Sequence, residues 1–354
     1  MNLNEDSLNF SDYPYKVFQQ CNLLKTEWSY AQSVKCVIST IVSVWCAYVL
    51  PFFSFFGVVT NLFIAFYAIL RANKVPRQII YISGICLSSA IANITFIWLW
   101  QFPVRGLTYA SHGSIFFSIV NVSPTACRFQ RYMYAFSSTM MCNMHICASL
   151  DRCLAIYIPT KLKNFPNIYG WYIYIGILLF SASMMLPFGV KVDWRLADKR
   201  ILCWVDRNDL PIQTYHTLFS NLAPIQTLFL ITIDSLFLMK IHKQLSQHSL
   251  TKLTSSDGGH LRRSLLLFIS SVSFIIIAIC QSVFYTIARF SSTGIISYQT
   301  GVDYDIADFF WYLNSVRELL DIYIYFKCFG SLRDCLIGIS RRISRGSLFK
   351  PDPL

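Results

Sequence analysis

Two groups of charged residues stand in otherwise apolar parts of the sequence. Arg317, Glu318 and Asp321 lie within one apolar run, and Asp151 and Arg152 lie at the end of another. A charge at bilayer depth costs roughly 2.5–3.5 kcal/mol, so such residues are rare, and they face a partner inside the protein. Arg317 and Asp321 are one helical turn apart, which puts both on one helix face. We expect an internal ion pair between them.

Cysteine is the second residue type whose positions suggest chemistry, and the chain has 12 of them. Most lie within apolar runs, where cysteine behaves as a small buried hydrophobe. Cys21, Cys36, Cys127 and Cys203 fall on the expected outer side of a membrane, where disulfides form. We expect Cys127 to pair with Cys203 and to hold a loop over the bundle mouth; the alternative is two free thiols. Cys21 and Cys36 could then pair with each other.

The elements that must position these residues are long apolar runs. The 354 residues are 55% hydrophobic and only 14% charged, far below the charge of a soluble domain. Each run has the about twenty residues that a helix needs to cross a ~30 Å hydrocarbon core. Only helices satisfy every backbone polar group within such segments, and no short alternating strands suggest a β-barrel. The runs cover residues 41–71, 79–101, 127–157, 168–190, 213–239, 263–289 and 305–328.

The sequence therefore predicts an all-α membrane protein with a seven-transmembrane helix bundle at residues 41–328. Residues 1–40 form an extracellular tail without the apolar core of a cleavable signal peptide. Residues 329–354 form a cytoplasmic tail that begins with a short amphipathic helix, which suits contact with membrane lipids. Pro224 lies inside the fifth run, where a proline is expected to kink the helix.

The net charge of +12 suggests a nucleic-acid partner, but the distribution of charge argues against one. If residue 1 lies outside, more than half of the 30 Lys and Arg residues face inward and more than half of the 18 acids face outward. Basic residues gather on the cytoplasmic side of membrane proteins. We expect a multi-pass plasma-membrane protein with its N-terminus outside, its C-terminus in the cytoplasm and no nucleic-acid partner. Asn9, in the sequon Asn9-Phe10-Ser11, is then a glycosylation site.

The third run ends in the sequence DRCLAI at residues 151–156, followed by Pro159. This is similar to the D-R-Y-L-A-I-x-x-P pattern of rhodopsin-like G-protein-coupled receptors, and Cys127 precedes Arg152 at the spacing found there. The chain resembles that family over about residues 45–345. The alternative is a charge pair that merely anchors a helix end.

Other positions match that family in part. Residues 321–325 (DIYIY) are similar to its N-P-x-x-Y motif, with Tyr325 kept. The aspartate that anchors a sodium ion in the family is Ile91 here, and C-W-x-P becomes CQSV at residues 280–283, without tryptophan and proline. We therefore expect the internal ion pair of the seventh run to replace the sodium ion, the alternative being a purely structural pair. Further matches are Gly57, Asn61, Leu87, Ala90 and Pro224.

The resemblance implies a receptor that transmits the binding of an extracellular ligand to a heterotrimeric G protein. Arg152 would leave its neighbour Asp151 and contact the G protein together with Tyr325. Tyr134 stands where amine receptors carry an aspartate, and Ser315 where opsins carry a retinal-linking lysine. We therefore expect a peptide ligand rather than an amine or retinal, and no cofactor or metal.

The expected ligand pocket contains Tyr134, Trp311 and Tyr312 at outer helix ends. Acidic residues in the outer loops suit a basic or amidated peptide; they are Asp193, Asp198, Asp206, Asp209, Asp303, Asp305 and Asp308.

A transporter or channel is the alternative function, and it would use the charges of Arg317, Glu318 and Asp321. Such proteins are built from repeats and broken helices. No repeat is visible, and only the seventh run carries several charges. An enzyme is not expected, since neither H-E-x-x-H nor G-x-S-x-G occurs.

Overall fold

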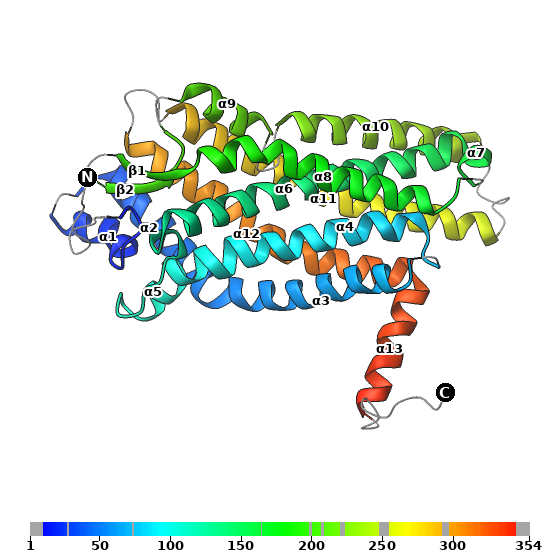
Figure 1. The fold of residues 1–354 in the computed structure, drawn as a ribbon, viewed down its shortest axis with the longest axis horizontal. Coiled ribbons are helices and arrows are strands. Elements are labelled where there is room, and N and C mark those ends of the chain that lie inside the picture. The colour runs from blue at the N-terminus through cyan, green and yellow to red at the C-terminus, as the bar shows by residue number, and fades with distance from the viewer. Residues whose placement is uncertain are drawn as a thin grey trace.

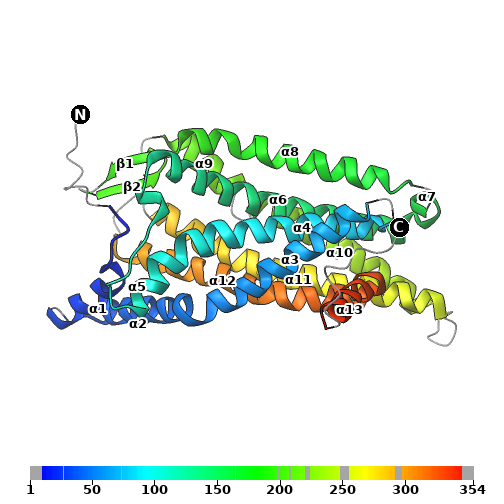
Figure 2. The same ribbon diagram turned by 60° about the horizontal axis from the view of Figure 1, so that its bottom comes forward.

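The computed structural model describes residues 10–344, except for residues 27, 73, 164, 198–199, 207–208, 220–223, 248–254 and 292–296. The described chain is mostly helical, and its long helices lie side by side along one axis (Figures 1 and 2). Two of these rods combine α- and π-helical parts: α2 (Tyr30–Val44), η2 (Trp45–Val49) and α3 (Leu50–Leu70), then α4 (Arg77–Ala92), η3 (Asn93–Gly106) and α5 (Leu107–Ala110). The others are α6 (Pro124–Tyr157), α8 (Ile168–Lys191), α10 (Pro224–Gln247), α11 (Ser255–Ser291) and α12 (Ser297–Cys328).

Five helical segments are long and apolar enough to cross a membrane, as expected for an all-α membrane protein. The segments are Tyr30–Leu70, Arg77–Ala110, Ile168–Lys191, Ile225–Lys243 and Arg263–Ala288. The first begins well before residue 41, because the polar residues after Tyr30 continue the same helix and pack against the tail. Helices α6 and α12 are long as well, but α6 is rich in small polar residues and α12 carries several charges.

Helix α6 packs against many elements of the bundle. It packs against α4, α8, α10 and α11, and much of its length is buried. Its start is set locally: the Ser123 side chain accepts a hydrogen bond from the Ala126 amide at 3.1 Å, and Pro124 occupies the first turn. Both residue types favour a helix N-terminus. The neighbouring helices therefore cover the polar face of α6.

Two helices of the structure cover the predicted run at 213–239: α9 (Leu210–Phe219) and α10, whose first described residue is Pro224. Residues 220–223 between them lie outside the described part of the chain, so the kink expected at Pro224 stays a prediction.

One end of the bundle carries a hairpin and part of the N-terminal tail, and we call it the outer end after the orientation predicted from the sequence. Strands β1 (Asp193–Ala197) and β2 (Arg200–Trp204) pair in antiparallel register, with Trp194 opposite Cys203. This hairpin is the only departure from an all-α fold in the described part of the chain. In Figure 1 the hairpin and α1 (Lys16–Thr26) lie at the same end of the molecule.

Two disulfides fix this outer end. Cys127 at the start of α6 is bonded to Cys203 of β2, as predicted. Cys21 is bonded to Cys36, which joins α1 to α2. The hairpin and α1 are therefore both covalently held against the bundle. The remaining short element on this side is the 3-10 turn η4 (Ile119–Asn121).

The opposite end, which we call the inner end after the same predicted orientation, carries α7 (Pro159–Lys163) and α13 (Gly330–Ser344). Helix α13 points away from the bundle (Figure 1). Leu332 is buried against the core and Cys335 packs beside it, while most of the first half of the helix is exposed. A helix of this composition after α12 agrees with the amphipathic helix predicted there.

Candidate functional site

A buried arginine joins three helices at the inner end of the bundle. Arg152 of α6 is 4% exposed, and its Nη2 lies 3.6 Å from Oδ1 of Asp234 on α10. The same nitrogen donates to the Ser149 hydroxyl at 2.6 Å. Ser149 in turn lies 3.2 Å from the hydroxyl of Ser271 on α11. One guanidinium therefore connects α6 with α10 directly and with α11 through two serines.

The expected pairing of Arg152 with Asp151 is wrong. Asp151 accepts a hydrogen bond from Nε of Arg77 at 2.5 Å; Asp151 is buried and Arg77 is partly buried. Adjacent residues on a helix point in different directions, so Asp151 faces α4 while Arg152 faces α10 and α11. The true partner, Asp234, was assigned no role from the sequence, although a single acid in an apolar run is a signal of a buried partner.

The predicted ion pair in α12 is formed. Arg317 Nη1 contacts Asp321 Oδ2, and both side chains are buried. Arg317 also donates from Nε to Oδ1 of Asn314 at 2.8 Å, and its guanidinium lies 5.0 Å from the centre of the Phe274 ring. Hydrogen bonding and ring contact orient this arginine inside the bundle.

Glu318 lies between three asparagines, an arrangement that the sequence did not reveal. Its Oε2 accepts from Asn61 of α3 at 3.0 Å and from Asn93 of η3 at 2.7 Å. Its Oε1 accepts from Asn314 at 3.0 Å. Ser315 donates to Oδ1 of Asn93 at 3.1 Å, which orients that amide. The cluster therefore joins α3, η3 and α12 by hydrogen bonds, and the asparagines within apolar runs were its only sequence signal.

Two adjacent serines of α11 lie beside the two polar clusters. Ser270 lies near Asp321 and Tyr325 of α12. The next residue, Ser271, lies 3.2 Å from the hydroxyl of Ser149 beside Arg152. Tyr325 is 2% exposed and belongs to the core.

The predicted ligand-pocket residues lie together near the outer end, in a buried aromatic cluster. Phe96 stacks on Tyr134 with ring centres 4.7 Å apart, and Tyr134 meets Trp311 edge to face at 5.5 Å. The Tyr312 ring centre is 6.0 Å from that of Phe96. Tyr134, Trp311 and Tyr312 are all buried, so these residues belong to the packed core rather than to an exposed pocket wall.

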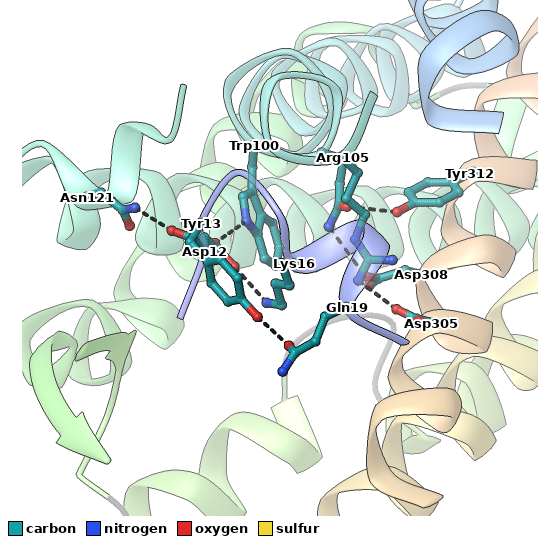
Figure 3. Close-up of polar contacts among 11 residues, drawn as sticks. Asp12, Tyr13, Lys16, Gln19, Trp100, Arg105, Asn121, Asp305, Asp308 and Tyr312 are labelled. Atoms are coloured by element: carbon teal, nitrogen blue, oxygen red, sulfur yellow. Dashed lines mark hydrogen bonds and ion pairs between the residues drawn. The ribbon is translucent and has the colours of Figure 1, made fainter. Parts of the chain in front are cut away.

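Several outer acids are paired within the protein. Arg105 lies 2.6 Å from Asp305 and 3.7 Å from Asp308, and Gln101 donates to Asp308 at 3.3 Å (Figure 3). The hydroxyl of Tyr312 donates to Oε1 of the same glutamine at 2.8 Å. Two further pairs are Arg128–Asp193 and Lys191–Asp209. Asp198 lies outside the described residues, as does the predicted glycosylation site Asn9. Internal pairing weakens the expectation that these acids attract a basic ligand.

The described part of the tail packs on the outer end of the bundle, against η3, η4 and the β hairpin. Asp12, which is 7% exposed, accepts from Lys16 at 2.8 Å and from Nε1 of Trp100 at 3.2 Å. Asn121 donates to the backbone oxygen of Asp12 at 2.9 Å (Figure 3). Burial alone would raise the pKa of Asp12, but the charges of Lys16 and Arg131 and the hydrogen bonds outweigh it and lower the pKa below 3.8. Asp12 is therefore ionised where the tail docks.

The buried polar clusters thus lie at three levels: around Asp12 at the outer end, around Glu318 in the middle of the bundle, and around Arg152 at the inner end. No group of three or more His, Cys, Asp or Glu side chains in the described residues is placed to hold a metal ion. No protein-family model matches the chain, and no curated protein matches it.

Proposed function

We propose that this chain is a G-protein-coupled receptor of the kind it resembles. In this proposal it lies in the plasma membrane with its N-terminus outside and its C-terminus in the cytoplasm. It converts binding of an extracellular ligand, a peptide rather than an amine or retinal, into activation of a heterotrimeric G protein. The ligand preference still depends on Tyr134 and Ser315, which replace the residues that bind amines and retinal in that family.

The proposal adds α6 and α12 to the five apolar segments as spans three and seven. At about 1.5 Å per residue, their 34 and 32 residues exceed a ~30 Å hydrocarbon core. Their lower hydropathy does not exclude this, because polar side chains are tolerated in a span when they bond to neighbouring helices. The hydrogen bond of Ser149 to Ser271 and those of Glu318 to Asn61 and Asn93 are of that kind.

The observation that carries the proposal is the buried Arg152, which joins α6 to α10 and, through serines, to α11. In a receptor, a ligand bound better by one arrangement of the helices shifts the population toward that arrangement. If the active arrangement separates Arg152 from Asp234, the inner ends of α10 and α11 are released. The guanidinium then becomes available to a helix of the G protein.

A panel of G-protein activation assays in cells tests this function. Wild type and Arg152→Ala are compared at matched surface expression, with Arg128→Ala as a control that removes an exposed outer arginine. We expect basal or ligand-driven activation from wild type and the control, and none from Arg152→Ala. Equal signals from all three would remove the receptor assignment.

Epitope tags test the topology in the same cells. A tag before residue 1 is expected to bind antibody on intact cells, and a tag after residue 354 only after permeabilisation. The reverse pattern would overturn the orientation.

The buried charges of α12 keep a transporter or channel as the second candidate. Arg317, Glu318 and Asp321 lie together in the interior, as ion pathways require. However, α12 is continuous through them, whereas transporter sites use interrupted helices. Ion currents or substrate uptake that depend on Glu318 but not on Arg152 would favour this candidate.

A further inference from the structure

Arg131 of α6 lies between two tryptophans beneath the docked tail. Its guanidinium carbon is 4.0 Å from the ring centre of Trp100 on η3 and 5.2 Å from that of Trp204 on β2. Such contacts hold a guanidinium by its face and leave its N–H edge for an anion. The edge is not fully used, because Nε of Arg131 is buried and has no hydrogen-bond partner in the described structure.

The acid with the strongest electrostatic attraction to Arg131 belongs to the tail. Among the acids that act on Arg131, Asp12 acts most strongly, ahead of Asp308, which already pairs with Arg105. No ion pair in the described chain includes Arg131, so Asp12 compensates its charge without contacting it directly. The Trp100 indole connects the two, since its ring faces Arg131 and its Nε1 donates to Asp12.

The described tail ahead of α1 is held at this end by noncovalent contacts. Ser11 donates its backbone amide to Ile201 of β2 at 2.9 Å, and the Phe10 ring packs edge to face on Trp194 at 5.1 Å. Asp12 adds its bonds to Lys16, Trp100 and Asn121. Farther along, the disulfide of Cys21 holds α1 to α2. Residues 10–15 can therefore be displaced without breaking a covalent bond while α1 stays attached.

We propose that Arg131, held between Trp100 and Trp204, binds a carboxylate of the extracellular ligand, and that Asp12 of the tail competes for this place. The inference rests on the proposed receptor function and gives its ligand a chemistry. An incoming carboxylate would take over the indole hydrogen bond and the charge compensation that Asp12 provides. Arginine suits this role because its planar N–H edge binds both oxygens of a carboxylate.

The proposal changes the expected ligand from a basic or amidated peptide to one with a free carboxylate. The acids that suggested a basic ligand include Asp193, Asp209, Asp305 and Asp308, all paired internally. Among the described residues, Arg131 forms no ion pair with an acid. The carboxylate could belong to the C-terminus of a peptide or to a small organic acid, and the two sources are separated by the test.

The test measures binding of matched probes to the purified full-length protein by ligand-observed NMR. The small probes are 4-phenylbutyrate, its amide and 4-phenylbutylamine. The peptide probes are acetyl-Phe-Phe with a free C-terminus and its C-terminal amide. The proteins are wild type, Asp12→Asn, Arg131→Gln and Arg131→Lys.

Asp12→Asn removes the competing charge with little change in shape. We expect it to bind an acid probe about tenfold or more tightly than the matching amide, since a hydrogen bond to a charged group contributes about 1.5–3 kcal/mol. Wild type should prefer the acid probe over the amide to a smaller degree, because Asp12 still competes. Arg131→Gln should lose the preference, and Arg131→Lys should keep only part of it, because an ammonium lacks the planar edge. The tighter acid, peptide or small molecule, identifies the source.

The proposal is overturned if Asp12→Asn binds acids and amides equally, prefers the amine, or binds no probe. Wild type and Asp12→Asn are sufficient to decide the test. The proposal can therefore be refuted even if the Arg131 variants fail to fold. The measurement needs no G protein. Failure here with intact Arg152-dependent signalling therefore rejects only the carboxylate site, whereas loss of Arg152-dependent signalling rejects the receptor function.

Discussion

Replacing Asp234 by asparagine removes the charge that holds Arg152 while keeping the size of the side chain. Both residues are 4% exposed, and one amino nitrogen of Arg152 and one oxygen of Asp234 have no hydrogen-bond partner. Loss of the carboxylate therefore leaves a buried guanidinium without a counter-charge. Among the described residues, its side-chain hydrogen bond to Ser149 remains, and its guanidinium lies 5.9 Å from the centre of the Phe237 ring.

The size of the effect follows from the burial. Removing one partner of a buried ion pair costs about 3–5 kcal/mol, and the 3.6 Å separation argues for the lower end. If about 3 kcal/mol is lost only from the closed arrangement, the ratio of open to closed states rises roughly 150-fold. A receptor that is about 1% open would then be roughly 60% open without ligand.

Basal G-protein activation in cells measures this shift, normalised to surface expression. Asp193→Asn is the matched control, because it removes an aspartate from a partly exposed ion pair with Arg128 that is worth at most about 1 kcal/mol. We expect strongly raised basal activity and a lower melting temperature for Asp234→Asn, and neither for the control. Wild-type basal activity together with wild-type melting would show that Asp234 does not hold Arg152.

Three further perturbations have defined outcomes. Glu318→Gln replaces a carboxylate that accepts three amide hydrogen bonds by a group with one oxygen. The free energy of unfolding should fall by about 1–3 kcal/mol in thermal unfolding. An unchanged melting temperature would show that these hydrogen bonds do not stabilise the fold. Gly106→Ala would place a methyl group 2.5 Å from the backbone oxygen of Cys46. We expect reduced surface expression and a destabilisation of about 1–3 kcal/mol. Wild-type expression would reject this close approach. Burial raises the pKa of Asp12, but Lys16 and the other partners lower it below 3.8, so its contribution to tail docking is present above that pH and lost as pH falls through the lowered pKa. A dye on the N-terminus should therefore report a docked tail from pH 5 to 8 and release only below about 3.8, a step that Asp12→Asn removes; release near neutral pH would count against this.

Local composition determined the helices and their membrane character. Long apolar runs without charges can satisfy their backbone only as helices, so five membrane-length segments follow from hydropathy. The Arg317–Asp321 contact was predictable too, because one helical turn always brings such residues together. The Cys127–Cys203 bond followed from topology, which leaves few outer cysteines to pair.

Tertiary structure alone decided which distant groups meet. The partners of Arg152 and Glu318 lie on other helices, and neighbouring sequence does not state how each helix is rotated about its axis. That rotation turned Asp151 toward Arg77 and away from Arg152. The docking of the tail on the bundle was not predicted either. Its polar composition is compatible with exposure to solvent as well as with contact to a tryptophan such as Trp100. Hydropathy is a property of each segment, whereas a buried charge finds its partner only when the packed helices bring the two groups together.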